Sequence, residues 1–84
     1  MIRDPHSKGE QAFRRFLRDS RKAAGLRQAD LAAHLGVPQS FVSKFESGER
    51  LLTFLEALSI FRELGVSVDD AVKNLPENQY ETKS

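Results

Sequence analysis

One stretch of the chain concentrates side chains that form directional hydrogen bonds although a simple helical fold has no need for them to be polar. They carry amide, hydroxyl and ammonium groups: Gln28, Gln39, Ser40 and Lys44. Such groups donate and accept hydrogen bonds at fixed angles, which suits recognition of another polar surface. Catalysis is not indicated, because Ser20, Ser40 and Ser43 lack the His and carboxylate partners that activate a serine nucleophile. The segment therefore predicts a binding protein, and we expect the chain not to be an enzyme.

Metal and cofactor chemistry has equally little support in the sequence. The chain contains no cysteine and only two isolated histidines, His6 and His34. Histidines without cysteines or suitably spaced carboxylates do not make a metal site. The sequence also lacks a glycine-rich phosphate loop and an HExxH motif. We therefore expect no metal and no cofactor.

The length and hydropathy of the chain limit its architecture and location. Its 84 residues are enough for one domain with a thin apolar core. The sequence contains no apolar run long enough to cross a bilayer, and the residues at its start do not resemble a secretory signal. We expect the protein to remain in the cytoplasm and to make no membrane contact.

The formal net charge of +1 hides an uneven distribution. Residues 1–50 carry ten basic and six acidic side chains, whereas residues 51–84 carry three and six. This uneven distribution suggests that one end of the chain meets a polyanion and the other does not. An ordinary solvated surface would also produce this distribution. Charge alone does not separate these two readings. The same alternative applies to a basic cluster that we interpret as a solvated face, with phosphate contact left open: Arg14, Arg15, Arg18 and Lys22.

Capping and glycine signals divide the chain into five short helices with almost no strand signal. Ser7, Thr53 and Ser67 are each followed three residues later by an acidic residue, which is the capping-box pattern of a helix start. The predicted helices cover residues 8–24, 28–35, 39–47, 54–64 and 68–75. Glycines end four of them: Gly25, Gly36, Gly48 and Gly65. The inward face of the fourth helix is expected to hold Leu55, Leu58, Phe61 and Leu64. We predict a flexible segment 1–9, a domain 10–75 and a flexible tail 76–84.

The second and third predicted helices have a particular relationship. A tight turn around Gly36, Val37 and Pro38 joins them, and the small Ala32 and Ala33 allow a close approach. This is the pattern of a helix-turn-helix, in which the second helix projects as a rod that fits the DNA major groove.

The residues of this segment resemble those of a known family, the Cro/CI-type (XRE-like) helix-turn-helix family of phage repressors and bacterial regulators. The matching run is Arg21-x-x-x-Gly25-Leu26-x-Gln28-x-Asp30-Leu31-Ala32-x-x-Leu35-Gly36-Val37-x-Gln39-Ser40-x-Val42-Ser43-Lys44-x-Glu46-x-Gly48. The resemblance extends from Phe13 to Leu75. It implies an all-α, lambda-repressor-like bundle of five short helices and sequence-specific binding of double-stranded DNA.

The resemblance also implies a role for individual residues. The resemblance assigns base reading to four residues on one face of helix 39–47: Gln39, Ser40, Ser43 and Lys44. A glutamine at this place makes a bidentate contact with adenine, and a lysine donates to guanine. Phosphate contacts fall to a second set: Gln28, Arg27, Ser47 and Arg50. Arg21 and Glu46 match a family ion pair that fixes the angle of the third helix, so we assign both to structure.

The sequence departs from the family pattern at three positions. Arg27 and Pro38 replace the Ser or Thr that often caps the second and third helices, and each missing cap costs about 1 kcal/mol. Leu52 replaces a frequent proline before the fourth helix. None of these changes removes a predicted base contact. The change at Pro38 does remove a hydroxyl that could bind phosphate.

Partner predictions follow from the apolar C-terminal third and from the resemblance. Residues such as Leu51, Phe54 and Val68 exceed what so small a core can hide, so we expect a homodimer formed through the C-terminal helices. A dimer would bind a palindromic operator on the nucleoid. The alternatives are an antitoxin with a toxin partner, a restriction–modification controller, or an interaction module that has lost DNA contact. The last alternative is disfavoured because nothing in the fold needs four of the side chains to be polar: Gln28, Gln39, Ser40 and Lys44.

Overall fold

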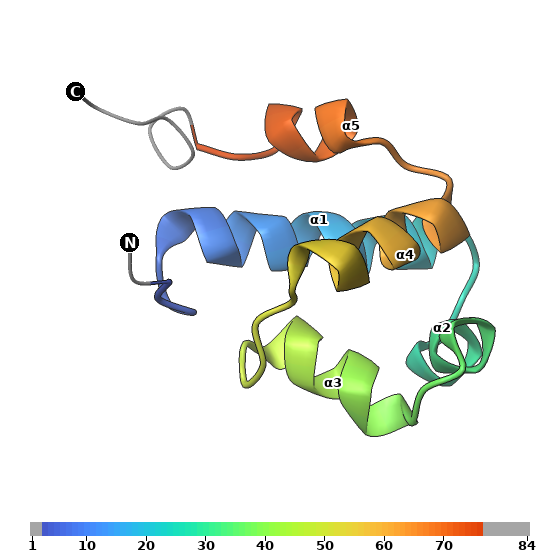
Figure 1. Cartoon of the computed structure of the whole chain (residues 1–84). Helices are drawn as coiled ribbons and strands as arrows, with labels where there is room; N and C mark the ends of the chain where they lie inside the picture. The colour runs from blue at the N-terminus through green and yellow to red at the C-terminus, as the bar shows by residue number, and fades with distance from the viewer. Residues whose placement is uncertain (1–2, 77–84) are drawn as a thin grey trace.

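The computed structural model describes residues 3–76, and within this range the chain folds into helices joined by turns and short loops. The helices are α1 Lys8–Ala23, α2 Gln28–Leu35, α3 Gln39–Ser47, α4 Phe54–Leu64 and α5 Val68–Lys73. In Figure 1, α1 and α4 cross the middle of the molecule, α2 and α3 lie on one side of them, and α5 lies on the other. The prediction of an all-α bundle of five short helices is confirmed.

Side-chain caps begin α4 and α5 as the sequence predicts. The Thr53 hydroxyl accepts from the N–H of Glu56 at 3.1 Å, and the Glu56 carboxylate accepts from the N–H of Thr53 at 2.9 Å. Ser67 and Asp70 make the same reciprocal bonds at 3.0 and 2.9 Å. Each box satisfies N–H groups that a helix start leaves without an intrahelical partner, which fixes where these helices begin.

The start of α1 keeps only half of the predicted box. The Ser7 hydroxyl accepts from the N–H of Glu10 at 3.2 Å, but the N–H of Ser7 donates to the carbonyl of Asp4. The Glu10 carboxylate instead accepts two hydrogen bonds from the Arg3 guanidinium, at 2.7 and 3.1 Å. A guanidinium is a stronger partner for a carboxylate than a backbone N–H. Because Arg3 also donates to the carbonyl of Leu52 at 2.6 Å, the chain before α1 is tied to the chain before α4.

Two glycines shape the ends of α2 and α3. Gly36 has a φ of +71°, and the N–H of Val37 reaches back to the carbonyl of Ala32. Gly48 has a φ of +91°, and a Cβ there would lie 3.0 Å from the guanidinium carbon of Arg14. Glycine enters this left-handed region without the steric cost that other residues incur. The turn between α2 and α3 is therefore sharp and well defined.

The core draws its most buried side chains from four of the helices. The largest of them are each below 2% exposed: Phe45, Leu17, Leu31, Ile60 and Val42. Phe13 and Phe61 pack edge to face at the margin of this cluster, with ring centroids 6.1 Å apart. All buried side-chain nitrogen and oxygen atoms in residues 3–76 have a hydrogen-bond partner.

The predicted inward face of α4 is wrong at one position. Leu55 is 73% exposed, whereas Ala57, Ile60 and Phe61 are buried. Leu58 and Leu64 pack against the core as predicted. Positions three and four apart share a helix face, and Leu55 is turned by about 200° from Ala57, so it projects away from the core. The prediction counted apolar residues at helical spacing and could not tell which of two apolar faces meets the rest of the bundle.

The last helix of the described chain, α5, is shorter than predicted. α5 ends at Lys73, two residues before the predicted end. Residues 77–84 of the predicted tail lie outside the described residues, as do residues 1–2 of the predicted N-terminal segment. In residues 3–76, we find no helix with the length and apolar character needed to span a bilayer.

The contrast between buried and exposed aromatic residues gives a stability test. Phe45→Ala should lower the free energy of unfolding by about 3–5 kcal/mol, because it removes a ring that is 1% exposed and leaves a cavity. Phe54→Ala removes the same atoms from a ring that is 70% exposed and should cost less than about 1 kcal/mol. Urea denaturation at a protein concentration that keeps the chain monomeric checks both values. Equal losses would contradict the placement of the core.

Candidate nucleic-acid interface

One face of α3 carries polar side chains that the rest of the described chain leaves open. All four members of this face are exposed: Gln39, Ser40, Ser43 and Lys44. Within residues 3–76, their side chains make no hydrogen bond or ion pair. The resemblance assigned base reading to these same four, and the helix brings them onto one surface. Their donors and acceptors are available to an external partner.

The opposite face of α3 is fixed in the core. Val42 is fully buried and Phe45 is 1% exposed. Phe41 is half-buried and packs edge to face on Phe45, with ring centroids 5.8 Å apart. Since α3 has only nine residues, it is too short to be stable alone and depends on this packing.

An ion pair holds the C-terminal end of α3 against α1. The Nε and Nη2 atoms of Arg21 donate to the two carboxylate oxygens of Glu46 at 2.7 and 3.1 Å. The two side chains are only 8% and 5% exposed. Arg21 also donates from Nη1 to the carbonyl of Leu26 at 2.7 Å, which ties the pair to the chain between α1 and α2. Both groups thus lie where the resemblance placed a structural pair.

Gln28 joins this network from the first residue of α2. Its Nε2 atom donates to a carboxylate oxygen of Glu46 at 3.0 Å. The amide group has two N–H donors, so one remains for another acceptor. The structure therefore places Gln28 beside the end of α3, at a helix N-terminus where anions are favoured.

Arg27 forms a bidentate ion pair with its neighbour Asp30. Its Nε and Nη2 atoms donate to the carboxylate at 3.1 and 3.0 Å, and its backbone N–H donates at 2.9 Å. These bonds lower the pKa of Asp30 to about 2, chiefly through the Arg27 side chain. A guanidinium has no acceptor, so only the acidic half of a capping box is present at the start of α2.

Arg50 is engaged in the same way by Glu56 at the start of α4. Its Nη1 and Nη2 atoms each donate to the carboxylate at 2.8 Å, and its guanidinium carbon lies 4.6 Å from the centre of the Phe41 ring. The Arg50 side chain is the main reason that the pKa of Glu56 falls to about 2. Ser47 donates to the carbonyl of Lys44 at 3.0 Å.

The sequence did not reveal that Arg27 and Arg50 are committed to carboxylates. For Arg27, the acidic residue three positions later was a usable signal. For Arg50, the partner lies six positions away across a loop, and no local rule links the two. Of the predicted phosphate residues, Gln28 and Ser47 also have internal partners. The two arginines and Gln28 keep donors beyond these bonds, whereas the single hydroxyl hydrogen of Ser47 would have to leave the Lys44 carbonyl to reach an anion.

Two short helices joined by a glycine turn, the second with an outward polar face, define the helix-turn-helix class. The Helix-turn-helix family profile matches residues 17–70. Among solved structures, an XRE-family like protein from Pseudomonas syringae pv. tomato str. DC3000 is 43% identical, with a TM-score of 0.70, over 75% of this chain and 77% of that one. A search of curated proteins gave no significant match. The chain belongs to the XRE-type helix-turn-helix family, and it is a DNA-binding regulator of that type.

The buried ion pair can be tested by a double-mutant cycle. Arg21→Met should lower the free energy of unfolding by about 3–5 kcal/mol, because it leaves the Glu46 carboxylate buried without its cation. Adding Glu46→Leu should recover most of this loss, since the uncompensated charge is then gone. Urea denaturation of the wild type, the two single variants and the double variant measures the coupling energy between Arg21 and Glu46. A double variant no more stable than Arg21→Met would contradict the pair.

Proposed function

We propose that this protein is a sequence-specific regulator of transcription that binds double-stranded DNA through the exposed polar face of α3. The observation that carries the proposal is the contrast between the two faces of this helix. One is locked by Phe45 and the Glu46 ion pair, and the other presents side chains with free hydrogen-bonding groups. A rigid helix with free polar groups meets the requirement for reading base edges in the major groove. The protein acts without catalysis, on the nucleoid in the cytoplasm.

Each group on the polar face has a chemical counterpart on a base. Gln39, at the first position of α3, binds adenine through its amide oxygen and nitrogen. Lys44 donates to N7 or O6 of guanine, and the hydroxyls of Ser40 and Ser43 bind either kind of group. The N-terminal end of α3 therefore enters the groove first.

Contacts with the DNA backbone supply affinity on either side of α3. Gln28 donates to a phosphate with its second amide hydrogen, at the N-terminus of α2. Arg27 and Arg50 contact phosphates with the donors that their internal bonds leave free, since a guanidinium has five N–H donors. Ser47 contacts a phosphate by turning its one hydroxyl hydrogen away from the Lys44 carbonyl. Because the Glu56 carboxylate holds Arg50 in place, its remaining donors are already oriented when DNA arrives. These contacts position the protein and carry no sequence information.

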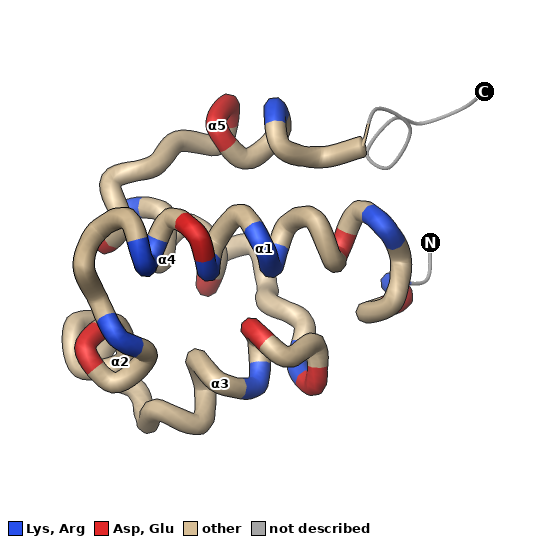
Figure 2. The backbone as a smooth tube through the Cα atoms, turned by 180° about the vertical axis from the view of Figure 1, so that it is seen from behind, with Lys and Arg blue, Asp and Glu red and all other residues tan. Residues whose placement is uncertain are grey.

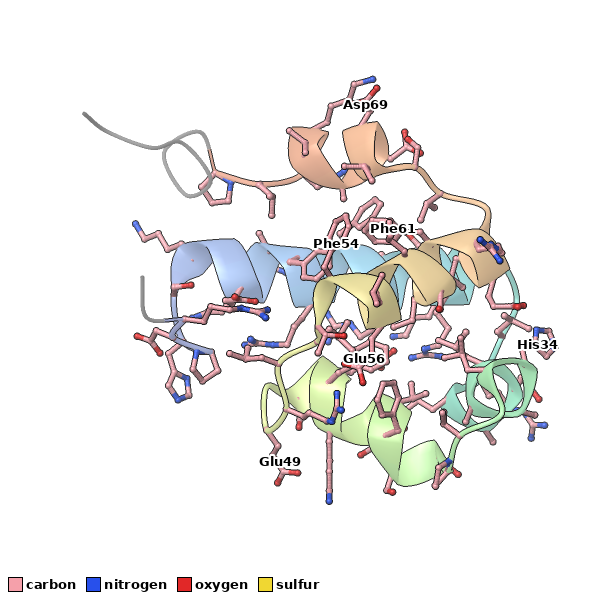
Figure 3. The ribbon with its side chains drawn as sticks, viewed as in Figure 1. His34, Glu49, Phe54, Glu56, Phe61 and Asp69 are labelled. Carbon is pink, nitrogen blue, oxygen red and sulfur yellow. The ribbon has the colours of Figure 1, made fainter. Side chains whose placement is uncertain are left out.

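We further propose that two copies associate through α4 and α5. Three large apolar side chains are exposed on these helices: Phe54 at 70%, Leu55 at 73% and Val68 at 47%. Phe54 and Phe61 lie on the side of α4 that faces α5 (Figure 3), beside an open groove of about 290 Å³. A second copy would cover this apolar surface, and the resulting two-fold axis matches a palindromic operator with half-sites about one helical turn apart.

Base reading and phosphate binding predict different mutant behaviour. After selection of bound sequences from a random duplex pool, Lys44→Ala should cost about 1–3 kcal/mol in binding and relax one base position. Gln28→Ala should weaken binding to all sequences alike. Titration of the selected duplex and an unrelated one separates the two effects. If neither substitution changes binding, the proposed contacts are wrong.

Association through α4 and α5 predicts a concentration-dependent equilibrium that one exposed residue controls. Leu55→Glu should shift the protein to monomer by placing a charge on the apolar face, without loss of fold, because Leu55 is 73% exposed. Ala29→Glu puts the same charge on an exposed position of α2 and should leave the dimer intact. Sedimentation equilibrium at micromolar concentration tells them apart. A wild-type protein that stays monomeric there would refute the dimer.

A further inference from the structure

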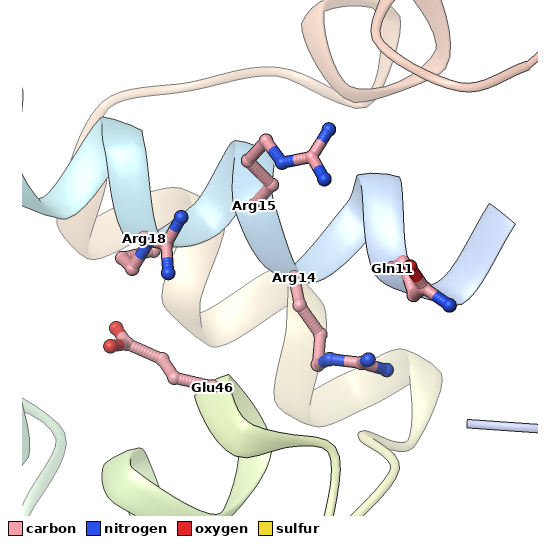
Figure 4. A pocket seen from close by; sticks show the side chains of 5 residues that line it. All are labelled: Gln11, Arg14, Arg15, Arg18 and Glu46. Atoms are coloured by element: carbon pink, nitrogen blue, oxygen red, sulfur yellow. The ribbon is translucent and has the colours of Figure 1, made fainter. Parts of the chain in front are cut away.

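A shallow cavity lies between α1 and the end of α3, away from the polar face of α3. Its volume is about 160 Å³. Figure 4 shows its lining, which comes from α1 and from one residue of α3: Gln11, Arg14, Arg15, Arg18 and Glu46. The lining thus holds three guanidinium groups and a single carboxylate. In Figure 2, basic positions recur along α1.

The carboxylate in this cavity does not neutralise the guanidinium groups around it. Glu46 already accepts two hydrogen bonds from Arg21 and one from Gln28, and its side chain is only 5% exposed. Arg21 therefore compensates the charge of Glu46 from outside the cavity lining. An excess of positive charge remains at the cavity and attracts an anion.

The three arginines are not equally available. Arg14 donates from Nη1 to the carbonyl of Pro5 at 2.6 Å, and its guanidinium packs beneath Gly48. Within residues 3–76, the one ion pair of Arg18 is with Asp19 at 4.0 Å, and its side chain is 46% exposed. Arg15 is exposed, and its side chain has no hydrogen bond or ion pair in the described part of the chain. Arg15 and Arg18 thus keep their donors free, while Arg14 forms a fixed wall.

We propose that Arg15 and Arg18 form a second phosphate-binding site, which contacts the DNA backbone beyond the segment that α3 reads. This inference rests on the proposed function and extends its footprint onto α1. The location supports it, because Glu46 touches Gln28 on one side and lines the arginine cavity on the other. The proposal therefore requires that a DNA strand held at the N-terminus of α2 continues past Arg18 toward Arg15.

The shape of the site favours a DNA phosphate over a small free anion. The cavity is shallow, and exposed ion pairs in water contribute only about 0–1 kcal/mol each. A single small anion would therefore bind weakly. DNA that α3 already holds presents its flanking phosphates at a high effective concentration, so the same weak contacts add to the total affinity.

The test compares two double variants with the same net charge. Arg15→Gln with Arg18→Gln removes the proposed site, and glutamine keeps a comparable helix propensity. Arg62→Gln with Lys73→Gln removes two exposed charges from α4 and α5 as the control. Binding of the selected duplex is measured between 0.1 and 1 M salt, with thermal melting and sedimentation to show that fold and dimer are unchanged.

The site variant should lower the slope of log K against log salt by about 1.8, since each lost phosphate contact removes about 0.9. If binding is equal at 1 M salt, this slope gives about a 60-fold loss at 0.1 M. Ethylation of flanking phosphates should weaken the wild type and not the site variant.

Two other outcomes separate the inference from the proposed function. If the site variant and the control variant bind with the same slope and affinity, the second phosphate site is refuted and DNA reading by α3 stands. If the wild-type protein binds no duplex, both proposals fall.

Discussion

The ion pair between Arg21 and Glu46 is the contact on which the proposed binding surface depends. α3 is nine residues long, so its direction is set by its attachments. Apolar packing of Val42 and Phe45 holds one side of the helix, but such packing is non-directional and does not by itself fix the angle of the helix. The bidentate geometry of the pair fixes the end of the helix relative to α1, and Gln28 fixes it relative to α2. A buried pair adds little net stability because both charges lose their hydration. Its contribution here is the angle at which α3 is presented.

The basic side chains fall into two groups with different physical roles. Arg3, Arg27 and Arg50 each make a bidentate contact with a carboxylate. The lowered pKa values of Asp30 and Glu56 mean that these carboxylates stay charged down to strongly acidic pH, so their cations stay neutralised. The charges of Lys44 and of the arginines that line the cavity between α1 and α3 are not compensated by such a bidentate contact within the described residues. The net charge of +1 therefore understates the positive potential near α3.

Local rules in the sequence account for most of the fold and less of the site. Caps such as Thr53 and glycines such as Gly36 act within a few residues, so they placed the helix limits closely. The prediction that Leu55 faces inward was wrong because the choice of an inward face depends on where the other helices lie. The engagement of Glu10 by Arg3 and of Arg50 by Glu56 was also invisible, since both link segments separated by a helix start or a loop. The polar face of α3 was predictable because one helix carries all of it, whereas the α1 cavity needs two helices to exist.

The loop between α3 and α4 connects the two surfaces on which the proposed function depends. It leaves the reading helix at Gly48 and reaches the apolar groove at Phe54, within a few residues. Three contacts brace it: burial of Leu52, the bond from Arg3 to the Leu52 carbonyl, and the Arg50–Glu56 pair. A dimer that binds two half-sites needs a fixed distance between its reading helices. In the proposed dimer, a loop braced in this way would transmit the position of the dimer contact to α3. The Arg50–Glu56 pair would then serve the proposed half-site spacing as well as the proposed phosphate contact.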